Sequence, residues 1–542
     1  MNNAVFSFEK PDNEVVLQYR KGSPEREAVI QAMQKMSNEQ VEIPLIIGGK
    51  EVHTGKTSKV VMPHNHSHVL ATYHQATERE VDMAIESSLK AKVEWENTSW
   101  IERSSIMLRA AELIAKKYRS LVVAATMLGQ DKSVHQAEID AACETIDFLR
   151  YNVHFASKIY GEQPASEFSQ LNRIEYRPLE GFIFTVTPFN FTAIASNLNT
   201  SAVLMGNTSV WKPASTSLLS SYYLMRIFKE AGLPDGVINF VPGSGSLIGN
   251  RVLKHKDMAG IHFTGSNGTF NTLWKNVSEN LHNYKSYPKI VGETGGKDFI
   301  FVHPSSNSRE VSTAIVRGAF EYQGQKCSAA SRSYIPRSLW PEIKENLIEQ
   351  AHQIKVGGVE DFSTFMNAVI DEKAFDNIMS YIEAAKKSDC CEIITGGAGD
   401  KSEGYFIQPT IILTTDPMFK TMQEEIFGPV MTIYVYEDSK FDETLELCNN
   451  TSPYGLTGSI FSNDRYAMLQ ACRKLRYAAG NFYINDKPTA AMVGMQPFGG
   501  ARASGTNDKA GGSFNLLRWV SPRTIKETFM PPTEIFYPYM EE

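Results

Sequence analysis

Residues 181–213 read GFIFTVTPFNFTAIASNLNTSAVLMGNTSVWKP, and the first 31 of them include no Asp, Glu, Lys, Arg or His. An uncharged run of this length is compatible with a transmembrane helix. Pro188, Asn190 and Asn197 argue against a span, because side-chain amides are costly in lipid. The pattern instead predicts a buried strand, a loop, a buried helix ending near Leu204 and a second strand at the centre of a globular protein.

The same alternation continues towards the C-terminus. Short apolar strands alternate with helices, and this rhythm is typical of a parallel sheet covered on both faces. A second such region begins at KIVGETGGKDFIFV, residues 289–302. Further strands are predicted at 236–243, 260–265, 331–336 and 430–436, and helices at 220–231, 247–254, 311–322 and 340–354.

The flanking segments follow other patterns. Residues 1–40 are charged and predict a helical arm, 44–75 are β-like, and 77–158 are mostly helical. The polar stretch 159–180 predicts a protruding hairpin, and the tail after residue 512 is strand-like.

Composition excludes several classes of protein. The 542 residues carry 54 basic and 61 acidic side chains, a net charge of −7, so a nucleic-acid partner is not expected. Six cysteines without a CxxC pair exclude a disulfide scaffold and a Cys/His zinc motif. The N-terminus MNNAVFSFEKPDNEV has no secretory or transit pattern, so we expect a cytoplasmic protein, or a mitochondrial matrix protein in a eukaryote.

Cys327 is the candidate nucleophile. It lies in EYQGQKCSAASR, residues 321–332, in a loop of small residues between a predicted helix and a predicted strand. The adjacent Lys326 is expected to lower the pKa of the thiol and raise its thiolate fraction. The alternative is a buried, inert cysteine. Glu293, flanked by glycines, is either a general base or a turn residue, and Asn190 is either structural or an oxyanion donor.

Two glycine-rich turns follow strands in the first βα region. They are PGSGSLIG at 242–249 and FTGSNGTF at 263–270. A strand, a tight turn and a helix N-terminus form a phosphate site, since free backbone N–H groups point outward there. Ordinary βα turns are the alternative, because the glycine spacing departs by one residue from the dinucleotide fingerprint.

Three histidines alternate in PHNHSH, at positions 64, 66 and 68. On a strand they would share one face. Without an acidic or cysteine partner nearby in the sequence, we expect solvent-exposed strand histidines and no metal site.

Taken together, the motifs resemble the aldehyde dehydrogenase superfamily. They occur in order: PFNF at 188–191, WKPA at 211–214, FTGS at 263–266, ETGGK at 293–297, GQKC at 324–327, EEIFGP at 424–429 and PFGG at 497–500. Longer segments resemble the branch that oxidises L-glutamate γ-semialdehyde to glutamate: GSPERE at 22–27, QAEIDAA at 136–142, GAFEYQGQKCSAASR at 318–332, NFYINDK at 481–487 and QPFGGARASGTNDKAGG at 496–512.

The resemblance implies an α/β fold with a Rossmann-type cofactor domain, an α/β catalytic domain and a small β oligomerisation element. The corresponding ranges are 1–156 with 180–291 for the NAD-binding domain, 292–511 for the catalytic domain, and 157–179 with 512–542 for the oligomerisation element. A homodimer or larger homo-oligomer is implied, with a small-molecule substrate and no nucleic-acid or membrane partner.

For catalysis, the resemblance implies that Cys327 attacks the aldehyde, Asn190 holds the oxyanion and Glu293 activates water. NAD is the implied cofactor. Ser215 stands where many NAD-specific relatives have Glu, which leaves weaker NADP use open. The implied cofactor-binding residues are Thr187, Lys212, Ser215, Gly245, Gly265, Ser266, Asn267, Gly268, Thr269, Glu425 and Phe427.

The implied substrate-binding residues are Lys326, Ser328, Ala490, Ala491, Phe498, Phe191 and Glu138. Many relatives have Gly-Ser or Gly-Ala where this chain has Ala490-Ala491, so a hydroxyl is lost and backbone freedom is reduced. For Glu138 a helix-surface charge is the alternative. Two other functions stay open: an aldehyde dehydrogenase for another semialdehyde or for broad aliphatic aldehydes, and a non-catalytic protein on the same fold.

Overall fold

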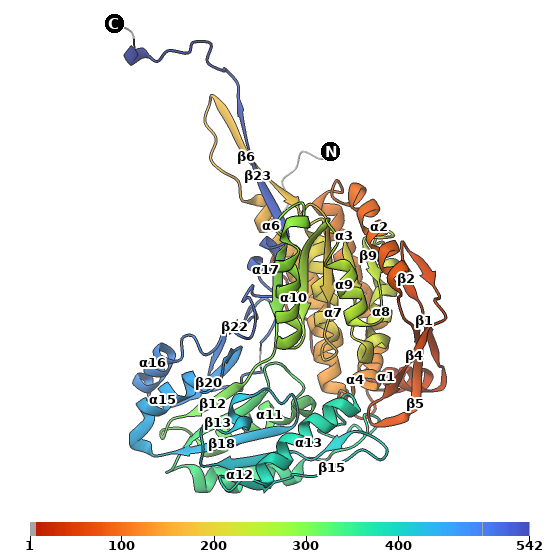
Figure 1. The fold of residues 1–542 in the computed structure, drawn as a ribbon. Coiled ribbons are helices and arrows are strands. Elements are labelled where there is room, and N and C mark those ends of the chain that lie inside the picture. The colour runs from red at the N-terminus through yellow and green to blue at the C-terminus, as the bar shows by residue number, and fades with distance from the viewer. Residues whose placement is uncertain (1–6, 490, 541–542) are drawn as a thin grey trace.

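The computed structural model describes residues 7–489 and 491–540, which form two seven-stranded sheets in separate layers (Figure 1). In the first sheet the strand order is β11-β10-β7-β8-β9-β2-β3, and all neighbours from β11 to β9 are parallel. Its strands are β7 (Phe182–Val186), β8 (Ser209–Lys212), β9 (Ile238–Phe240), β10 (Met258–Thr264), β11 (Lys289–Glu293), β2 (Leu45–Ile47) and β3 (Lys50–Val52).

The uncharged segment lies at the centre of this sheet because both faces are covered. Along β7, Phe182 and Phe184 pack on one face with helices α2, α9 and α10, while Ile183 packs on the other face with α7 and α8. The helices are α2 (Glu78–Trp95), α7 (Thr192–Leu204), α8 (Leu218–Glu230), α9 (Gly245–Val252) and α10 (Asn267–Glu279). The predicted strand–helix–strand arrangement is confirmed, and among the described residues no helix is both long and apolar enough to cross a membrane.

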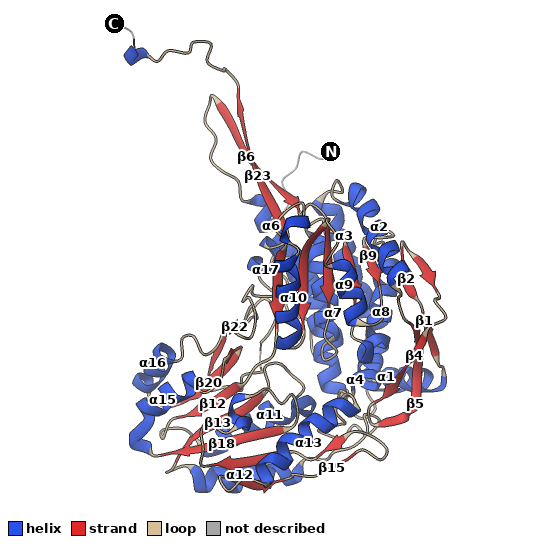
Figure 2. Cartoon of the chain, in the orientation of Figure 1, coloured by secondary structure: helices blue, strands red, loops and turns tan. Residues whose placement is uncertain are grey.

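The second sheet has the order β14-β17-β18-β13-β12-β20-β21, parallel except for the β14–β17 pair (Figure 2). Helices α11 and α12 pack on one face, and α13, α15 and α16 on the other. The strands are β12 (Asp298–Val302), β13 (Ala330–Pro336), β14 (Cys391–Thr395), β17 (Thr410–Thr414), β18 (Val430–Tyr436), β20 (Thr457–Phe461) and β21 (Asn481–Ile484). The helices are α11 (Ser308–Phe320), α12 (Trp340–Gln353), α13 (Glu372–Lys386), α15 (Phe441–Asn450) and α16 (Arg465–Lys474).

A helical layer lies between β3 and β7 in sequence and packs beside α7 and α8. It contains α3 (Trp100–Glu112), α4 (Arg119–Gln130), α5 (Val134–Ala137) and α6 (Thr145–Gly161), with π-helical turns at Leu113–Tyr118 and Glu138–Glu144. The small sheet β1-β5-β4, made of β1 (Val41–Ile43), β4 (Thr57–Met62) and β5 (Asn65–His74), contacts this layer through β4 and α4.

The predicted helical arm over 1–40 is wrong for its first part. The helix α1 spans only Pro24–Asn38, and residues 7–23 form no regular helix or strand. Side chains of the helical layer hold this segment: Asp147 accepts the N–H of Glu14 at 2.8 Å, and Glu138 accepts the N–H of Leu17 at 3.0 Å. Backbone N–H groups bound in this way have no need of helical partners.

The predicted protruding hairpin over 159–180 is wrong in its strand pairing, although the segment does protrude. Its strand β6 (Gln170–Pro178) pairs antiparallel with β23 (Val520–Thr528), a strand from the C-terminal tail. Figure 1 shows this two-stranded ribbon projecting from the body, with the tail continuing beyond it. The tail carries exposed apolar side chains, among them Phe529, Ile535 and Tyr539.

One buried ion pair fixes the start of helix α7. The carboxylate of Asp140 accepts a hydrogen bond from the ammonium group of Lys132 at 2.7 Å, and both side chains are fully buried. The same carboxylate accepts the N–H groups of Thr192 at 3.0 Å and Ala193 at 2.8 Å, where α7 begins. A negative charge at a helix N-terminus satisfies orphan donors and complements the helix dipole.

We expect Asp140→Ala to lower the free energy of unfolding by about 3–5 kcal/mol, because it leaves the Lys132 ammonium buried without its partner. Chemical denaturation measures this change. The control is Glu349→Ala, which removes the exposed pair with Arg309 and should cost at most about 1 kcal/mol. Equal losses in the two variants would contradict the assigned role of the buried pair.

Candidate active site

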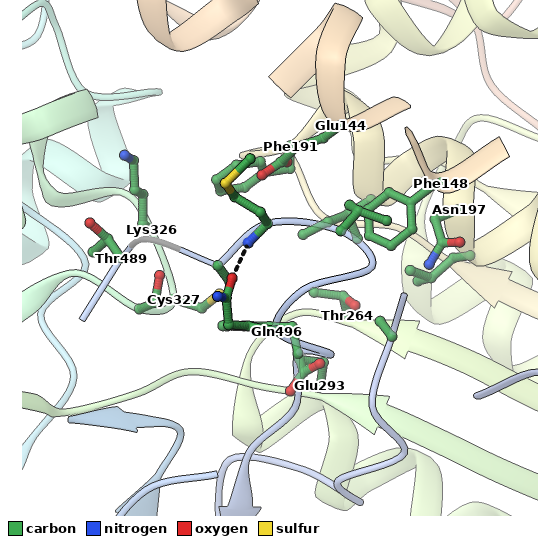
Figure 3. Close-up of a pocket in the computed structure, with 18 of the residues that line it drawn as sticks. Glu144, Phe148, Phe191, Asn197, Thr264, Glu293, Lys326, Cys327, Thr489 and Gln496 are labelled. Carbon is green, nitrogen blue, oxygen red and sulfur yellow. Dashed lines mark hydrogen bonds between the residues drawn. The ribbon is translucent and has the colours of Figure 1, made fainter. Parts of the chain in front are cut away.

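A cavity of about 360 Å³ lies between the two sheets, and Cys327 and Glu293 both line it (Figure 3). Phe148 from the helical layer and Phe191 from the start of α7 contribute to its other wall. Of the predicted substrate-binding residues, Lys326, Ser328, Ala491, Phe498 and Phe191 line this cavity, whereas Ala490 lies outside the described residues.

The loop that carries Cys327 has an unusual backbone. Tyr322, Gln323 and Gly324 follow helix α11 with φ values of 52°, 54° and 67°, in the left-handed region. Only glycine adopts this region without strain, and at Gly324 a Cβ would lie 2.2 Å from the carbonyl oxygen of Gly428. The three left-handed residues turn the chain sharply just before Cys327, which lines the cavity.

Glu293 is the last residue of β11. Its Oε1 accepts the N–H of Gly500 at 2.9 Å. Burial raises the pKa of Glu293 to about 8, although that hydrogen bond and Lys509 act in the opposite direction. Figure 3 shows Glu293 and Cys327 among the side chains that line the cavity. A carboxyl group with this pKa can exchange a proton near neutral pH.

The expected effect of Lys326 on the thiol is not what the structure shows. The Lys326 ammonium pairs with Glu321 at 3.2 Å, and Glu321 also lies 3.5 Å from the ammonium of Lys487. Burial, followed by the charges of Glu293 and Asp298, raises the pKa of Cys327 well above its ordinary value. The thiol therefore needs a base or a ligand-induced change to become a thiolate.

Asn190 lies beside the nucleophile loop. Its Nδ2 donates to the carbonyl oxygen of Gln325 at 3.1 Å, two residues before Cys327, and its side chain is buried. A primary amide has two N–H donors, so one hydrogen remains for an oxyanion near the sulfur.

The predicted cofactor residues gather at the carboxyl ends of the parallel strands. Strands β8 and β9 lie on one side of β7, and β10 and β11 on the other, so the sheet reverses its order between β7 and β10. Ligands bind at such switch points. Thr187 follows β7, Lys212 ends β8, Ser215 begins a short 3-10 helix, Gly245 begins α9, and Gly265, Ser266, Asn267, Gly268 and Thr269 lead from β10 into α10.

Glu425 and Phe427 come from the second sheet, in the loop before β18. Glu425 accepts the N–H of Gly296 at 3.1 Å, and burial raises its pKa to about 7. Phe427 has φ +58° and its ring meets Phe189 edge-on at 5.8 Å between centroids. Both residues thus lie close to the ETGGK and PFNF segments.

Glu138 is neither a lining residue of this cavity nor a surface charge. Its carboxylate is fully buried and pairs with Arg119 at 2.5 Å and with the hydroxyl of Tyr19 at 2.7 Å. The side chain therefore anchors the N-terminal segment, because its two oxygens already bind these donors.

Glu144 lines the cavity instead, and the sequence analysis did not identify it. Burial raises its pKa to about 8, with Asp140 adding to the effect and Lys132 opposing it. The available signal was its spacing, four residues after Asp140 and four before Phe148, which puts a carboxyl group on a buried helical face.

The expectation of exposed histidines in PHNHSH is wrong. His66 and His68 are half-buried, and His64 is buried beside Asp131 and Glu360. Both partners are distant in sequence, so no local pattern could reveal them.

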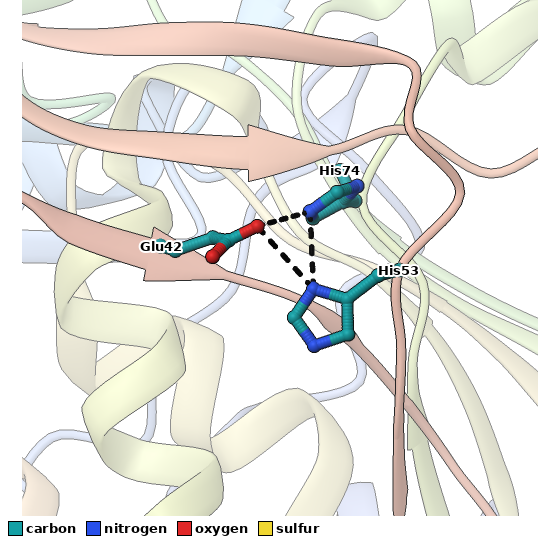
Figure 4. Close-up of side chains that lie close together, drawn as sticks. All are labelled: Glu42, His53 and His74. Atoms are coloured by element: carbon teal, nitrogen blue, oxygen red, sulfur yellow. Dashed lines mark hydrogen bonds and ion pairs between the residues drawn. The ribbon is translucent and has the colours of Figure 1, made fainter.

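A different group, Glu42, His53 and His74, has the residue types of a metal site (Figure 4). Nδ1 of His74 lies 3.1 Å from the N–H of Gly55, and Nε2 lies 2.7 Å from the Glu42 carboxylate. Nδ1 is then an acceptor, and the ring proton is on Nε2 where a metal would bind. Hydrogen bonds alone account for this group.

We expect the charge of Glu293 to slow the alkylation of Cys327. At pH 9 Glu293 is ionised and its charge raises the thiol pKa, so Glu293→Gln should increase the alkylation rate by about threefold to tenfold. Iodoacetamide labelling of the peptide that contains Cys327 measures the rate. An unchanged or slower rate would contradict this electrostatic coupling.

Comparison with known proteins agrees with these observations. The model of the aldehyde dehydrogenase family matches residues 51–525. A relative from Dictyostelium discoideum, named delta-1-pyrroline-5-carboxylate dehydrogenase, mitochondrial, is 55% identical over 533 residues, which cover 98% of this chain and 96% of that protein. The Homo sapiens protein with the same name is 48% identical over 533 residues, covering 98% of this chain and 95% of that protein.

Solved structures give the same result. The crystal structure of the Delta-pyrroline-5-carboxylate dehydrogenase from Mycobacterium tuberculosis bound with NAD has a TM-score of 0.96 and 46% identity, covering 99% of this chain and 100% of that one. The 1-pyrroline-5-carboxylate dehydrogenase from Thermus with bound NAD has a TM-score of 0.91 and 32% identity, covering 97% and 100%. The chain belongs to the aldehyde dehydrogenase family.

Proposed function

We propose that this protein oxidises L-glutamate γ-semialdehyde, the open form of 1-pyrroline-5-carboxylate, to L-glutamate with NAD, in proline catabolism. The observation that carries the proposal is the cavity in which Cys327 and Glu293 meet Glu144 and Lys326. It combines a nucleophile and a base with acidic and basic side chains, Glu144 and Lys326 among them, that can pair with an amino-acid head group. Relatives similar over nearly the whole chain are named for this activity.

NAD fits the carboxyl edge of the first sheet. At Gly265 a Cβ would lie 2.7 Å from the ring of Phe263, and Ser266 accepts the N–H of Thr269 where α10 begins. Lys212 extends over Gly245, and burial lowers its pKa without a contribution from a charged neighbour in the described part of the chain. Lys212 and the N–H groups would hold the ribose and the pyrophosphate, and Glu425 with Phe427 the nicotinamide end. Ser215 leaves weaker NADP use within the proposal.

The chemistry of the chain follows from the site. Cys327 attacks the aldehyde carbon as thiolate, and the second N–H of Asn190 with the N–H of Cys327 holds the resulting oxyanion. A bound nicotinamide supplies the acceptor for the hydride. Cys327 is then a thioester, and Glu293 takes a proton from the water that hydrolyses it.

The amino-acid head of the substrate needs both charges. The Glu144 carboxylate would bind the ammonium group, while Lys326 and Ser328 would bind the carboxylate. Phe191 and Phe498 would flank the aliphatic part. In the loop over 487–498, Ala490-Ala491 would offer backbone N–H groups but no hydroxyl, which many relatives have at this place. For this reason an aldehyde dehydrogenase for another semialdehyde, or for a broad range of aldehydes, is the second candidate function.

The domain limits are part of the same proposal, with residues 1–156 and 180–291 binding NAD and 292–511 carrying catalysis. The segments 157–179 and 512–542 would bind a second copy of this chain, and the compartment would be the cytoplasm. If the chain is eukaryotic, we propose the mitochondrial matrix instead of the cytoplasm, since relatives from Dictyostelium discoideum and Homo sapiens are named mitochondrial.

The substrate assignment predicts rapid NADH formation from L-glutamate γ-semialdehyde and much slower formation from propanal. Cys327→Ala should lower kcat by at least about 10³-fold, because it removes the nucleophile. Absorbance of NADH measures both, with NADP as the comparison cofactor. Equal rates with both aldehydes would favour the second candidate, and no NADH from either would contradict the proposal.

The raised pKa of Glu293 predicts the pH dependence of thioester hydrolysis. Only the ionised carboxylate accepts a proton, so the rate should rise about tenfold per pH unit below pH 8 and level off above it. Glu293→Gln should lower hydrolysis by about 10²-fold or more and remove this rise. Single-turnover measurements across pH 6–10 test this, and a rise that persists in Glu293→Gln would assign it to another group.

The oligomer is tested by deleting residues 529–542, which contain the exposed apolar tail. We expect light scattering to give a mass of at least two chains for the full protein and a smaller mass for the truncated one, since burying apolar area drives association. A monomeric full-length protein would contradict the role of these segments.

A further inference from the structure

The first histidine of PHNHSH is a buried junction between three distant segments. His64 lies in the turn between β4 and β5, and its Nδ1 contacts Asp131 at the end of α4. Its Nε2 lies 3.1 Å from Glu360, in the loop after α12. The His64 ring is almost fully buried, and the Asp131 carboxylate is fully buried.

The other oxygen atoms of Asp131 bind two further segments of the chain. Its Oδ2 accepts the N–H of Ala368 at 2.7 Å, and its carbonyl oxygen accepts Nε2 of Gln323 at 2.8 Å. The residue has φ +53°, which is unfavourable for a non-glycine side chain. His64 is thus the group that holds one carboxylate oxygen while the other oxygen binds the 368 segment.

Gln323 belongs to the left-handed turn before the nucleophile. Its Nε2 also donates to the carbonyl oxygen of Ala368 at 2.8 Å, so one amide ties the turn to both Asp131 and Ala368. Gln325 adds a second tie, because its Oε1 accepts the N–H of Ile370 at 2.9 Å. A strained turn persists only where its surroundings determine its geometry, and these bonds do so for the turn before Cys327.

We propose that His64 is a positioning residue for Cys327, acting through Asp131 and Gln323 on the strained turn of the nucleophile loop. The inference rests on the proposed function only in taking Cys327 as the nucleophile. His64 touches neither the cavity around Cys327 nor the predicted cofactor residues.

The charge of His64 supports this role. Burial alone would lower the pKa of the imidazole, but Asp131 and Glu360 outweigh burial and raise the pKa to about 10. The ring therefore stays protonated at neutral pH and donates from both nitrogens. A neutral, apolar side chain at position 64 would leave the Asp131 carboxylate buried without its cation.

The test compares three single variants. His64→Leu removes the contact, His64→Asn keeps a donor in the place of Nδ1, and His68→Leu is the matched control. His68 is in the same motif, but its Nε2 binds the carbonyl oxygen of Ser37 in α1 instead of Asp131. The readouts are kcat, KM for the aldehyde, the dissociation constant of NAD, and the alkylation rate of Cys327 in folded protein.

We expect His64→Leu to lower kcat and change the alkylation rate by about tenfold, with KM and the NAD dissociation constant within twofold of the wild type. His64→Asn should recover at least half of kcat, and His68→Leu should match the wild type. Since partial unfolding of His64→Leu would also weaken NAD binding and raise KM, a loss confined to kcat and the alkylation rate separates positioning from folding.

A double-mutant cycle with Gln323→Ala identifies the route. If His64 acts through Gln323, the double variant should be no worse than the worse single variant. Multiplied losses in the double variant, or a wild-type kcat in His64→Leu, would overturn the inference. A wild-type protein that oxidises no aldehyde would instead overturn the proposed function, and the alkylation rates would then still decide whether His64 positions Cys327.

Discussion

The chain passes from one sheet to the other within four residues, between Glu293 at the end of β11 and Asp298 at the start of β12. No Cβ fits at the centre of this crossing. At Gly295 a Cβ would lie 1.9 Å from the Glu425 carboxylate, and at Gly296 it would lie 2.5 Å from the carbonyl oxygen of Cys327. These two glycines allow Glu293, Cys327 and Glu425 to lie close together, so the site depends on a backbone that can approach this closely.

Burial in this crowded site also shifts the pKa values of its ionisable groups. Glu293 and Glu144 both have their pKa raised to about 8 by burial in the same cavity, and burial likewise raises the pKa of the Cys327 thiol. Charged forms are therefore disfavoured until a substrate brings its own charges or a proton is moved. An ammonium group beside Glu144 would restore the carboxylate, which links binding of an amino-acid aldehyde to the ionisation of the site.

Patterns among neighbouring residues were enough to predict the central strands and helices and the main residues of the cavity. The alternation of apolar strands and helices from Gly181 onward depends on neighbouring residues, and the structure confirms it. The positions of Cys327 and Glu293 on one cavity also agree with the motifs that suggested them. What the sequence could not supply was pairing over long distances. Strand β6 joins a strand about 350 residues away, and His64 finds Glu360 across 296 residues. In the same way, the partner of Lys326 is Glu321 rather than the thiol, because side-chain direction depends on the strained turn between them.

The central claim is that an aldehyde is oxidised on Cys327 and released by water that Glu293 activates. The most direct measurement is mass spectrometry of the Glu293→Gln variant after mixing with L-glutamate γ-semialdehyde and NAD, followed by acid quenching and peptide mapping. The account predicts an acyl group derived from glutamate on the peptide that contains Cys327, persisting far longer than in the wild type. An acyl group on another residue, or an unmodified Cys327 in a variant that turns over at the wild-type rate, would contradict it.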